Sequence, residues 1–257
     1  MIMSLPIIDK VIQKKILKEL TAAFGGNFYE VIIGGAAFNP EVEAFFKKIG
    51  FPLTVGYGMT ECAPIITYAD WKEARLTSCG REVMNMKVRI DSSDPENIPG
   101  EIQVSGPNVF LGYYKNEQAT AEVTTDDGWF RTGDMGIIDK DGFLYIRGRS
   151  KCMILGPSGQ NIYPEEIEAV VNNVNYVVDS LVIEDNGNLV SLIFPDYHQA
   201  ELDGLSKEQL EERINAALPE INKQVPNYAK ISKIEFLPED FERTPKRSIK
   251  RYLYQRN

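Results

Sequence analysis

The sequence is poor in the residues that form zinc and disulfide sites. It contains 3 cysteines, Cys62, Cys79 and Cys152, and a single histidine, His198. The cysteines lack the CxxC spacing of structural zinc sites, and one histidine cannot complete a ligand set for this metal. We therefore expect free thiols, which are the ordinary state of cysteine in a reducing cytoplasm.

Positive charge and long apolar runs are also scarce. The chain carries 28 Lys and Arg against 37 Asp and Glu, a net charge of -9. This balance argues against nucleic acid as the main ligand, because counterion release needs a basic surface, whereas a small anionic ligand needs only local positive groups. No apolar run approaches the roughly 20 residues that span a bilayer, and the N-terminus lacks the pattern of a secretion signal. We expect a soluble, cytoplasmic protein whose membrane contact is at most peripheral.

The first part of the chain has the pattern of an α/β protein. Its 257 residues can form one large or two modest domains, and 43% hydrophobic and 25% charged residues are ordinary for a globular protein. The alternation of strand and helix favours the end of a parallel sheet. Glycine-containing loops, Gly34–Ala37 and Gly56–Glu61, follow the two strands, where ligands of open α/β sheets bind. We expect a helix over residues 7–24, a strand over 28–33, a helix over 40–49 and a strand over 51–55.

Short strands bounded by Gly and Pro follow Pro64 and predict a small β-barrel. Its last hairpin turns at Asp139–Gly142, and we expect a tight turn at Thr132-Gly133-Asp134 to separate two of its strands. After Lys151 the pattern becomes α+β, which places the boundary between two domains, 1–150 and 151–257, at Ser150 and Lys151. The barrel strands are expected at 87–90, 101–104, 129–131, 135–139 and 143–147; the second domain is expected to contain helices over 165–172 and 207–223, a hairpin at 186–188 and a strand over 231–237.

Three motifs in the middle of the chain resemble those of one enzyme superfamily. They are Thr132-Gly133-Asp134, Gly148-Arg149-Ser150-Lys151 and Asn161-Ile162-Tyr163-Pro164-Glu165-Glu166-Ile167-Glu168. Together they resemble the adenylate-forming acyl-CoA synthetases, which include firefly luciferase and the adenylation domains of peptide synthetases. The last motif is most similar to that of long-chain fatty acid–CoA ligases. The resemblance implies the adenylate-forming architecture, with a large AMP-binding domain that ends near residue 150 and a small mobile C-terminal domain.

The same resemblance implies roles for residues of these motifs. Asp134 matches the carboxylate that binds the ribose hydroxyls of ATP, and Arg149 matches the guanidinium beside the ribose and phosphate. Lys151 matches the hinge between the two domains. A carboxylate suits two adjacent hydroxyl donors and a guanidinium suits phosphate oxygens, so the chemistry agrees with these roles.

The two glycine-containing loops match further motifs of the family. The resemblance places Gly34, Gly35 and Ala36 along adenine, and Tyr57, followed by Gly58, on the face of the base. It implies that Thr60 bonds the α-phosphate and that Glu61 holds Mg²⁺. Plain core packing remains the alternative for Tyr57, and a solvated loop acid the alternative for Glu61.

A basic cluster, Arg243–Arg251, lies near the C-terminus. By composition alone it is a solvated basic tail. In the family this segment supplies a lysine that bridges the carboxylate substrate and the phosphate during adenylation, and the matching position here is Ser248. We expect Lys246 or Lys250 to supply the catalytic charge; weak adenylation and an altered activity are the alternatives.

The Ser/Thr/Gly-rich loop with a lysine that holds the β- and γ-phosphates in this family is absent before Gly34. We therefore expect a truncated chain that lacks the N-terminal part of its own large domain and is inactive alone. The parent is predicted to be an ATP-dependent fatty acid–CoA ligase that makes an acyl-adenylate and then acyl-CoA, using a carboxylic acid, ATP, Mg²⁺ and coenzyme A. The alternatives are another adenylating enzyme, with an aryl or amino acid substrate or a carrier-protein acceptor, and a non-catalytic nucleotide-binding module.

Overall fold

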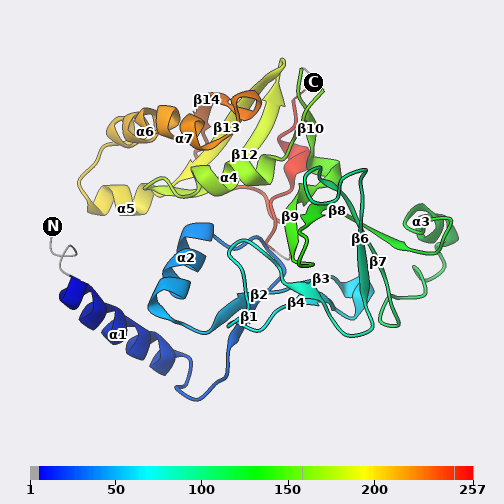
Figure 1. The fold of residues 1–257 in the computed structure, drawn as a ribbon. Helices are drawn as coiled ribbons and strands as arrows, with labels where there is room; N and C mark the ends of the chain where they lie inside the picture. Colours follow the sequence, from blue (N-terminus) through cyan, green and yellow to red (C-terminus); the bar gives the residue numbers. More distant parts are fainter. Residues whose placement is uncertain (1–5, 158, 246, 257) are drawn as a thin grey trace. The chain divides into compact units, whose positions relative to one another are not determined.

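The computed structural model describes residues 6–157, 159–245 and 247–256. It divides into two compact units, Met1–Ile146 and Arg147–Asn257, which are described separately below (Figure 1). The predicted domain boundary at Ser150 and Lys151 lies a few residues farther along the chain than the division between the units.

The first unit begins with the expected strand and helix alternation. Helix α1 (Pro6–Ala23) is followed by β1 (Val31–Ile33), α2 (Pro40–Ile49) and β2 (Leu53–Val55). Strands β1 and β2 pair in parallel, which confirms the predicted end of a parallel sheet. Helix α2 begins where the Asn39 side chain accepts a hydrogen bond from the Glu41 N–H at 2.9 Å, and it ends at Gly50 with φ 75°.

Two further sheets complete the first unit. The three-stranded sheet contains β3 (Tyr57–Gly58), β4 (Ile65–Tyr68) and β5 (Arg81–Glu82), with the short helix η1 (Thr60–Cys62) after β3. The four-stranded sheet contains β6 (Lys87–Asp91), β7 (Gly100–Ser105), β8 (Phe130–Ile138) and β9 (Leu144–Arg149), with α3 (Glu117–Glu122) between β7 and β8. The division between the units falls within β9, after Ile146.

Backbone hydrogen bonds at Leu144 join these two sheets. The Leu144 carbonyl accepts from the Cys79 N–H at 2.9 Å, and the Leu144 N–H donates to the Gly80 carbonyl at 2.8 Å. Both sheets contribute to one core, because Ile66 of β4 is buried together with Ile102 of β7. The joined sheets correspond to the strands of the predicted small barrel.

The predicted turn at Thr132-Gly133-Asp134 is wrong. Residues 130–138 form one strand, β8, and a bulge within it replaces the turn. Arg131 pairs with Gln103 and Met135 pairs with Glu101, so that three residues of β8 lie opposite Ile102 alone. Gly133, at φ 72°, provides the backbone conformation that the bulge requires.

The second unit is an α+β fold around a three-stranded sheet, as predicted. The strands are β12 (Val177–Asp185), β13 (Asn188–Pro195) and β14 (Ile231–Phe236), with β13 in the centre and β12 at one edge. The remaining elements are η2 (Ser150–Cys152), β10 (Ile154–Leu155), β11 (Asn161–Ile162), α4 (Pro164–Val171), α5 (Tyr197–Leu202), α6 (Lys207–Ala216), α7 (Leu218–Gln224), η3 (Asn227–Ala229) and η4 (Arg251–Leu253).

Both faces of this sheet are covered by apolar side chains. Val182 of β12 and Ile193 of β13 belong to a core that includes residues of α4, α6 and α7. Leu181, one residue earlier on β12, packs on the other face against Phe241 from the segment after β14. The alternation of side chains along a strand therefore separates a helical layer from a C-terminal layer.

The helix predicted over residues 207–223 is two helices. Ser206 caps α6, since its hydroxyl accepts from the Gln209 N–H at 3.3 Å and the Gln209 side chain accepts from the Ser206 N–H at 2.9 Å. Helix α6 ends at Ala216, and Pro219 lies in the first turn of α7. Proline lacks the N–H that a continuous helix would use at this position, so the helix breaks here.

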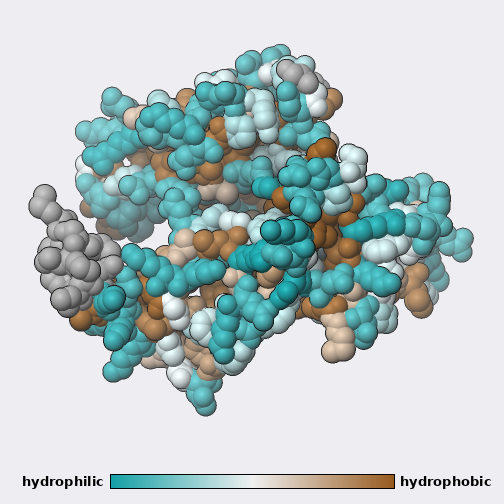
Figure 2. Space-filling model, in the orientation of Figure 1, coloured by the Kyte–Doolittle hydropathy of each residue, from teal (hydrophilic) through white to brown (hydrophobic). Residues whose placement is uncertain are grey.

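Hydrophilic residues cover most of the molecular face shown in Figure 2, and apolar residues form smaller patches between them. Within the part of the chain that the structure describes, no helix is both long and apolar enough to cross a membrane.

Candidate functional site

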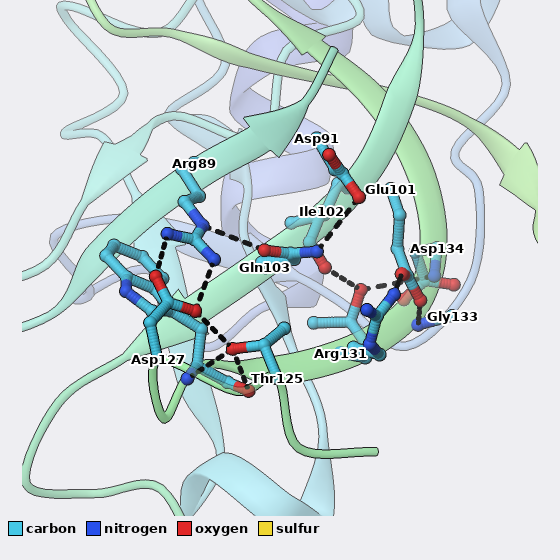
Figure 3. A network of polar contacts seen from close by, with 12 residues as sticks. Arg89, Asp91, Glu101, Ile102, Gln103, Thr125, Asp127, Arg131, Gly133 and Asp134 are labelled. Atoms are coloured by element: carbon cyan, nitrogen blue, oxygen red, sulfur yellow. Dashed lines mark hydrogen bonds and ion pairs between the residues drawn. The ribbon is translucent and has the colours of Figure 1, made fainter. Parts of the chain in front are cut away.

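The bulge of β8 directs Asp134 into the first unit (Figure 3). The Thr132 hydroxyl donates to the Ile102 carbonyl at 2.8 Å and accepts from the Asp134 N–H at 3.1 Å. Thr132 and Asp134 are each 5% exposed. One threonine hydroxyl therefore ties the bulge to β7 and fixes the backbone of the predicted ribose-binding residue.

Glu101 on β7 holds the bulge from the opposite strand. One of its carboxylate oxygens accepts from the Gly133 N–H at 3.3 Å, and the other accepts from the Arg131 guanidinium at 3.0 Å. Figure 3 shows both contacts beside Asp134. Glu101 could not be recognised from the sequence, because its role depends on the register between β7 and β8.

The same sheet contains a second polar network. Gln103, 2% exposed, accepts from Arg89 Nε at 2.8 Å and donates to Asp91 at 3.3 Å. The Arg89 guanidinium forms two hydrogen bonds with Asp127, at 2.6 and 2.9 Å (Figure 3). It also lies over the Trp129 ring, 4.4 Å from its centroid. These bonds lower the pKa of the Asp127 carboxyl. The network links β6, β7 and the segment before β8, and so supports the strand that carries Asp134.

Two of the predicted nucleotide-binding residues are in direct contact. The Tyr57 hydroxyl donates to Asp134 Oδ2 at 2.5 Å, and both side chains are buried. The Tyr57 ring also belongs to the core of the two joined sheets. This placement agrees with the packing alternative for Tyr57, while its contact with adenine stays a prediction.

The two glycine-containing loops lie next to each other. A Cβ atom at Gly34 would lie 3.3 Å from the Gly56 carbonyl oxygen, and one at Gly58 would lie 2.2 Å from the Pro64 carbonyl oxygen. Position 58 therefore requires glycine, because the backbone there passes too close to that of Pro64 to leave room for a Cβ atom. Gly35 has φ 87°, and the stretch Gly34–Ala36 is exposed. An exposed backbone without large side chains can accept a planar base against it.

The acidic residue predicted to bind magnesium is held by the segment before α3. The Glu61 carboxylate accepts from the Tyr113 hydroxyl at 3.1 Å, and its backbone carbonyl accepts from the Phe110 N–H at 2.7 Å. Burial and this carboxylate raise the pKa of Tyr113. The neighbouring Thr60 is exposed in η1. Tyr113 could not be recognised as a functional candidate from the sequence, because its contact with Glu61 joins residues 52 positions apart.

The residues around Glu61 fit Mg²⁺ only in combination with substrate phosphates. Among the residues that the structure describes, no three His, Cys, Asp or Glu side chains gather as a metal cluster. Mg²⁺ is commonly bound through one or two carboxylates and the phosphates of its substrate, and Glu61 supplies one such carboxylate.

The remaining predicted residues belong to the second unit. Arg149 ends β9 and Lys151 lies in η2, and both side chains are exposed. The Lys250 ammonium contacts the Glu242 carboxylate at 3.2 Å. Lys246 lies outside the described residues.

The segment that contains Ser248 is a small hairpin. The Thr244 N–H donates to the Ser248 carbonyl at 2.8 Å, and Arg243 and Ile249 form an antiparallel bridge. The Lys250 N–H closes its base on the Glu242 carbonyl at 2.8 Å. We call residues 242–245 and 247–250 the C-terminal hairpin.

Comparisons with known proteins cover most of the chain. Residues 5–114 match the model of the AMP-binding enzyme family, and residues 153–257 match that of the AMP-binding enzyme C-terminal domain. A long-chain fatty acid–CoA ligase of Mycobacterium bovis is 31% identical over 94% of this chain and 42% of its own length. A 2-succinylbenzoate–CoA ligase of Bacillus cytotoxicus is 38% identical over 66% of this chain and 37% of its own length.

Solved structures show the same fold. The o-succinylbenzoate–CoA synthetase of Bacillus subtilis, in complex with ATP and magnesium ion, matches with a TM-score of 0.73 and 24% identity over 91% of this chain and 49% of its own. ATP-bound MatB of Rhodopseudomonas palustris matches with a TM-score of 0.71 and 25% identity over 95% of this chain and 49% of its own. The chain therefore spans about half the length of these proteins, or less.

Proposed function

This chain belongs to the family of AMP-binding enzymes, and we propose that it is the C-terminal part of an ATP-dependent fatty acid–CoA ligase. The observation that carries the proposal is the buried hydrogen bond between Tyr57 and Asp134, which gathers two residues predicted to bind the nucleotide. The longer protein that contains this chain is called the parent protein below.

We propose fatty acids as the substrate class for two reasons. The motif Asn161–Glu168 resembles that of long-chain fatty acid–CoA ligases, and a ligase of that kind matches nearly the whole chain. An aryl acid is the second candidate, because the matching ligase of Bacillus cytotoxicus acts on 2-succinylbenzoate.

In the first half-reaction a carboxylate oxygen of the acid attacks the α-phosphorus of ATP. The bond to the bridging oxygen breaks, pyrophosphate leaves, and an acyl-adenylate remains. Asp134 accepts hydrogen bonds from the ribose hydroxyls, Arg149 lies beside the ribose and phosphate, and the Thr60 hydroxyl donates to the α-phosphate. Glu61 would hold Mg²⁺ together with the substrate phosphates, and the bound ion would supply positive charge beside them.

A lysine of the C-terminal segment, Lys246 or Lys250, lies between the two anions and offsets their repulsion.

In the second half-reaction the thiol of coenzyme A attacks the acyl carbonyl and AMP leaves. The two half-reactions need different groups around one intermediate, and rotation of the second unit about Lys151 exchanges them. Lys151→Pro should slow thioester formation much more than adenylation.

Apolar residues on the surface of the first unit support a longer parent protein. Ile32, in the middle of the parallel strand β1, is 50% exposed, and Val11 on α1 is 63% exposed. Parallel sheets are normally covered on both faces and extend over more than two strands. We propose that the N-terminal part of the same large domain covers these residues and supplies the loop that binds the β- and γ-phosphates.

The test is pyrophosphate release by the parent protein with fatty, aryl and amino acids, with and without coenzyme A. The proposal expects release with fatty acids and formation of acyl-CoA, both strongly reduced in Asp134→Asn. Release with aryl acids alone would select the second substrate class. Nucleotide binding without pyrophosphate release for any acid would overturn the ligase proposal and favour a non-catalytic nucleotide-binding module. The serine at position 248, where the family has its catalytic lysine, also favours that alternative.

A further inference from the structure

A buried ion pair lies at the open edge of the sheet in the second unit. The Arg251 guanidinium contacts Glu168 Oε2, and Glu168 Oε1 accepts from the Val182 N–H at 2.7 Å. Glu168 comes from α4 and Val182 from the edge strand β12. One carboxylate therefore connects the helical layer, the edge of the sheet and the C-terminal segment.

The residues that follow the predicted hinge lie against the same pair. The Arg251 guanidinium is 3.8 Å from Glu165 Oε1 in the first turn of α4. Burial and the Glu165 carboxylate raise the pKa of the Cys152 thiol, and Arg251 opposes this rise, so the thiol lies within the field of both charges. Cys152 directly follows Lys151 in the chain. At Gly148 an added Cβ would lie 2.6 Å from Glu165 Oε2, so the residues on both sides of Lys151, 148–152, which we call the linker, lie close to this carboxylate.

Arg251 also directly follows the C-terminal hairpin. Within the hairpin, Ile249 packs on the apolar face of the sheet with Phe241. The Glu242 N–H donates to the Tyr254 hydroxyl at 2.8 Å, and the Tyr254 and Phe241 rings pack edge to face with their centroids 5.3 Å apart. The residues on either side of Lys250 are thus held on the sheet.

The strength of this connection comes from burial. Glu168 is 7% exposed, and the side chain of Arg251 is 23% exposed. If the C-terminal segment moved away, the Glu168 carboxylate would remain in the interior without its charged partner, which is strongly unfavourable. The other ion pairs of this segment, such as that of Lys250 with Glu242, are more exposed and so contribute less.

We propose that Arg251 is a positioning residue: paired with Glu168, it joins the linker after Lys151, helix α4 and the C-terminal hairpin into one rigid block. A rotation about Lys151 then carries Lys250 with the whole unit, and the catalytic charge arrives at a defined position. The inference rests on the proposed ligase function, because it assigns a role to Arg251 in the adenylation half-reaction. Arg251 itself contacts no substrate in this role.

The test compares Arg251→Met with Arg256→Met in the parent protein. Arg256 is a matched control, since it lies on the same segment and contacts Asp185 and Glu235 at 3.0 Å each, but its side chain is 39% exposed and it contacts neither the linker nor α4. Acyl-adenylate formation is measured by pyrophosphate release, and thioester formation by the reaction of supplied acyl-adenylate with coenzyme A. Hydrogen exchange of residues 240–254 reports on the position of the hairpin without reference to activity.

We expect Arg251→Met to slow acyl-adenylate formation by about 100-fold, the usual consequence of displacing a catalytic group by about 1 Å. Thioester formation should change at least tenfold less, and residues 240–254 should exchange faster. Arg251→Lys should recover part of the rate, and Arg256→Met should resemble the wild type in all three measurements. Glu168→Gln combined with Arg251→Met removes both buried charges and should fold stably, yet it should keep the adenylation defect.

The inference is overturned if Arg251→Met slows both half-reactions equally, if Arg256→Met does the same as Arg251→Met, or if the double variant regains full adenylation. These outcomes are distinct from a failure of the proposed function, which would appear as an inactive wild-type parent protein. In that case, unchanged hydrogen exchange in Arg251→Met would still refute the rigid block, and faster exchange would support it.

Discussion

The hydrogen bond between Tyr57 and Asp134 gives the sharpest prediction about the candidate site. Tyr57→Phe removes one oxygen atom and leaves the ring in the core. The Tyr57 hydroxyl is 2.5 Å from Asp134 Oδ2, and the two residues are 7% and 5% exposed, so water cannot easily replace the lost donor. The substitution therefore leaves a buried carboxylate with one hydrogen bond fewer.

The expected magnitude follows from the charge and the burial. Hydrogen bonds to charged groups contribute about 1.5–3 kcal/mol, so Tyr57→Phe should lower the free energy of unfolding by about 2 kcal/mol. Asp134→Asn keeps an acceptor but removes the charge, which reduces the bond to the roughly 1 kcal/mol of a neutral pair. The double variant should then show a coupling energy of about 1 kcal/mol between the two positions.

The assay is urea unfolding of the parent protein and its variants, followed by tryptophan fluorescence. The two tryptophans of this chain, Trp71 and Trp129, belong to the first unit, so the part of the signal that is lost in Trp71→Phe and Trp129→Phe reports on the unit that contains this bond. Tyr114→Phe is the control, because Tyr114 is 87% exposed and should change stability by less than about 0.5 kcal/mol. A loss in Tyr57→Phe no larger than that of the control, or a coupling energy near zero, would refute the reasoning.

Three further outcomes follow from the structure. Gly100→Ala places a Cβ 2.1 Å from the Asp91 carbonyl oxygen, so it should lower the free energy of unfolding by about 2–3 kcal/mol. In the control Gly128→Ala the new Cβ meets no atom within 4 Å, so the free energy of unfolding should fall only by the roughly 1–2 kcal/mol that a positive φ costs. Equal losses in the two variants would contradict the steric argument. Burial raises the pKa of the Glu168 carboxyl to about 7 although the Arg251 guanidinium opposes the rise, so stability should fall as the pH rises from about 4.5 through 7 and the carboxylate ionises. Urea unfolding followed by circular dichroism should show this slope, steeper in Arg251→Met and flatter in Glu168→Gln; an unchanged slope in Glu168→Gln would contradict the assignment. Among the cysteines of this chain, a thiol reagent at pH 8 should label Cys152 first, because Cys62 and Cys79 are buried and their pKa values are raised to about 11 and about 12. Equal labelling rates for the three thiols, or a fast phase that persists in Cys152→Ser, would disprove this.

Several elements could be predicted from the sequence because their causes are local. The capping side chain of Asn39 and the glycine at position 50 lie within a few residues of the helix ends that they determine, and helix α2 was predicted with its observed bounds. The hairpin between β12 and β13 turns at Asn186-Gly187, where these residue types favour positive φ. The break at Pro219 also had a local signal, which the apolar periodicity on either side concealed.

The bulge in β8 shows where local reasoning ends. A glycine at positive φ suits a turn as well as a bulge, so Gly133 alone could not distinguish them. The choice depends on the register with β7, in which Glu101 and Thr132 hold the bulge in place. Glu101 could be recognised as a supporting residue only after that pairing was known.

By itself, the sequence determined the family, the order of the elements and the residue types available for nucleotide chemistry, because motifs and hydrophobic periods are properties of neighbouring residues. Only the tertiary structure decided which polar groups meet in the interior. Tyr57 and Asp134 are 77 positions apart, and Glu168 and Arg251 are 83 apart. The partner of a buried charge is the oppositely charged or polar group that the packing of strands and helices brings next to it. The spacing of the two residues along the chain does not predict their distance in the folded structure.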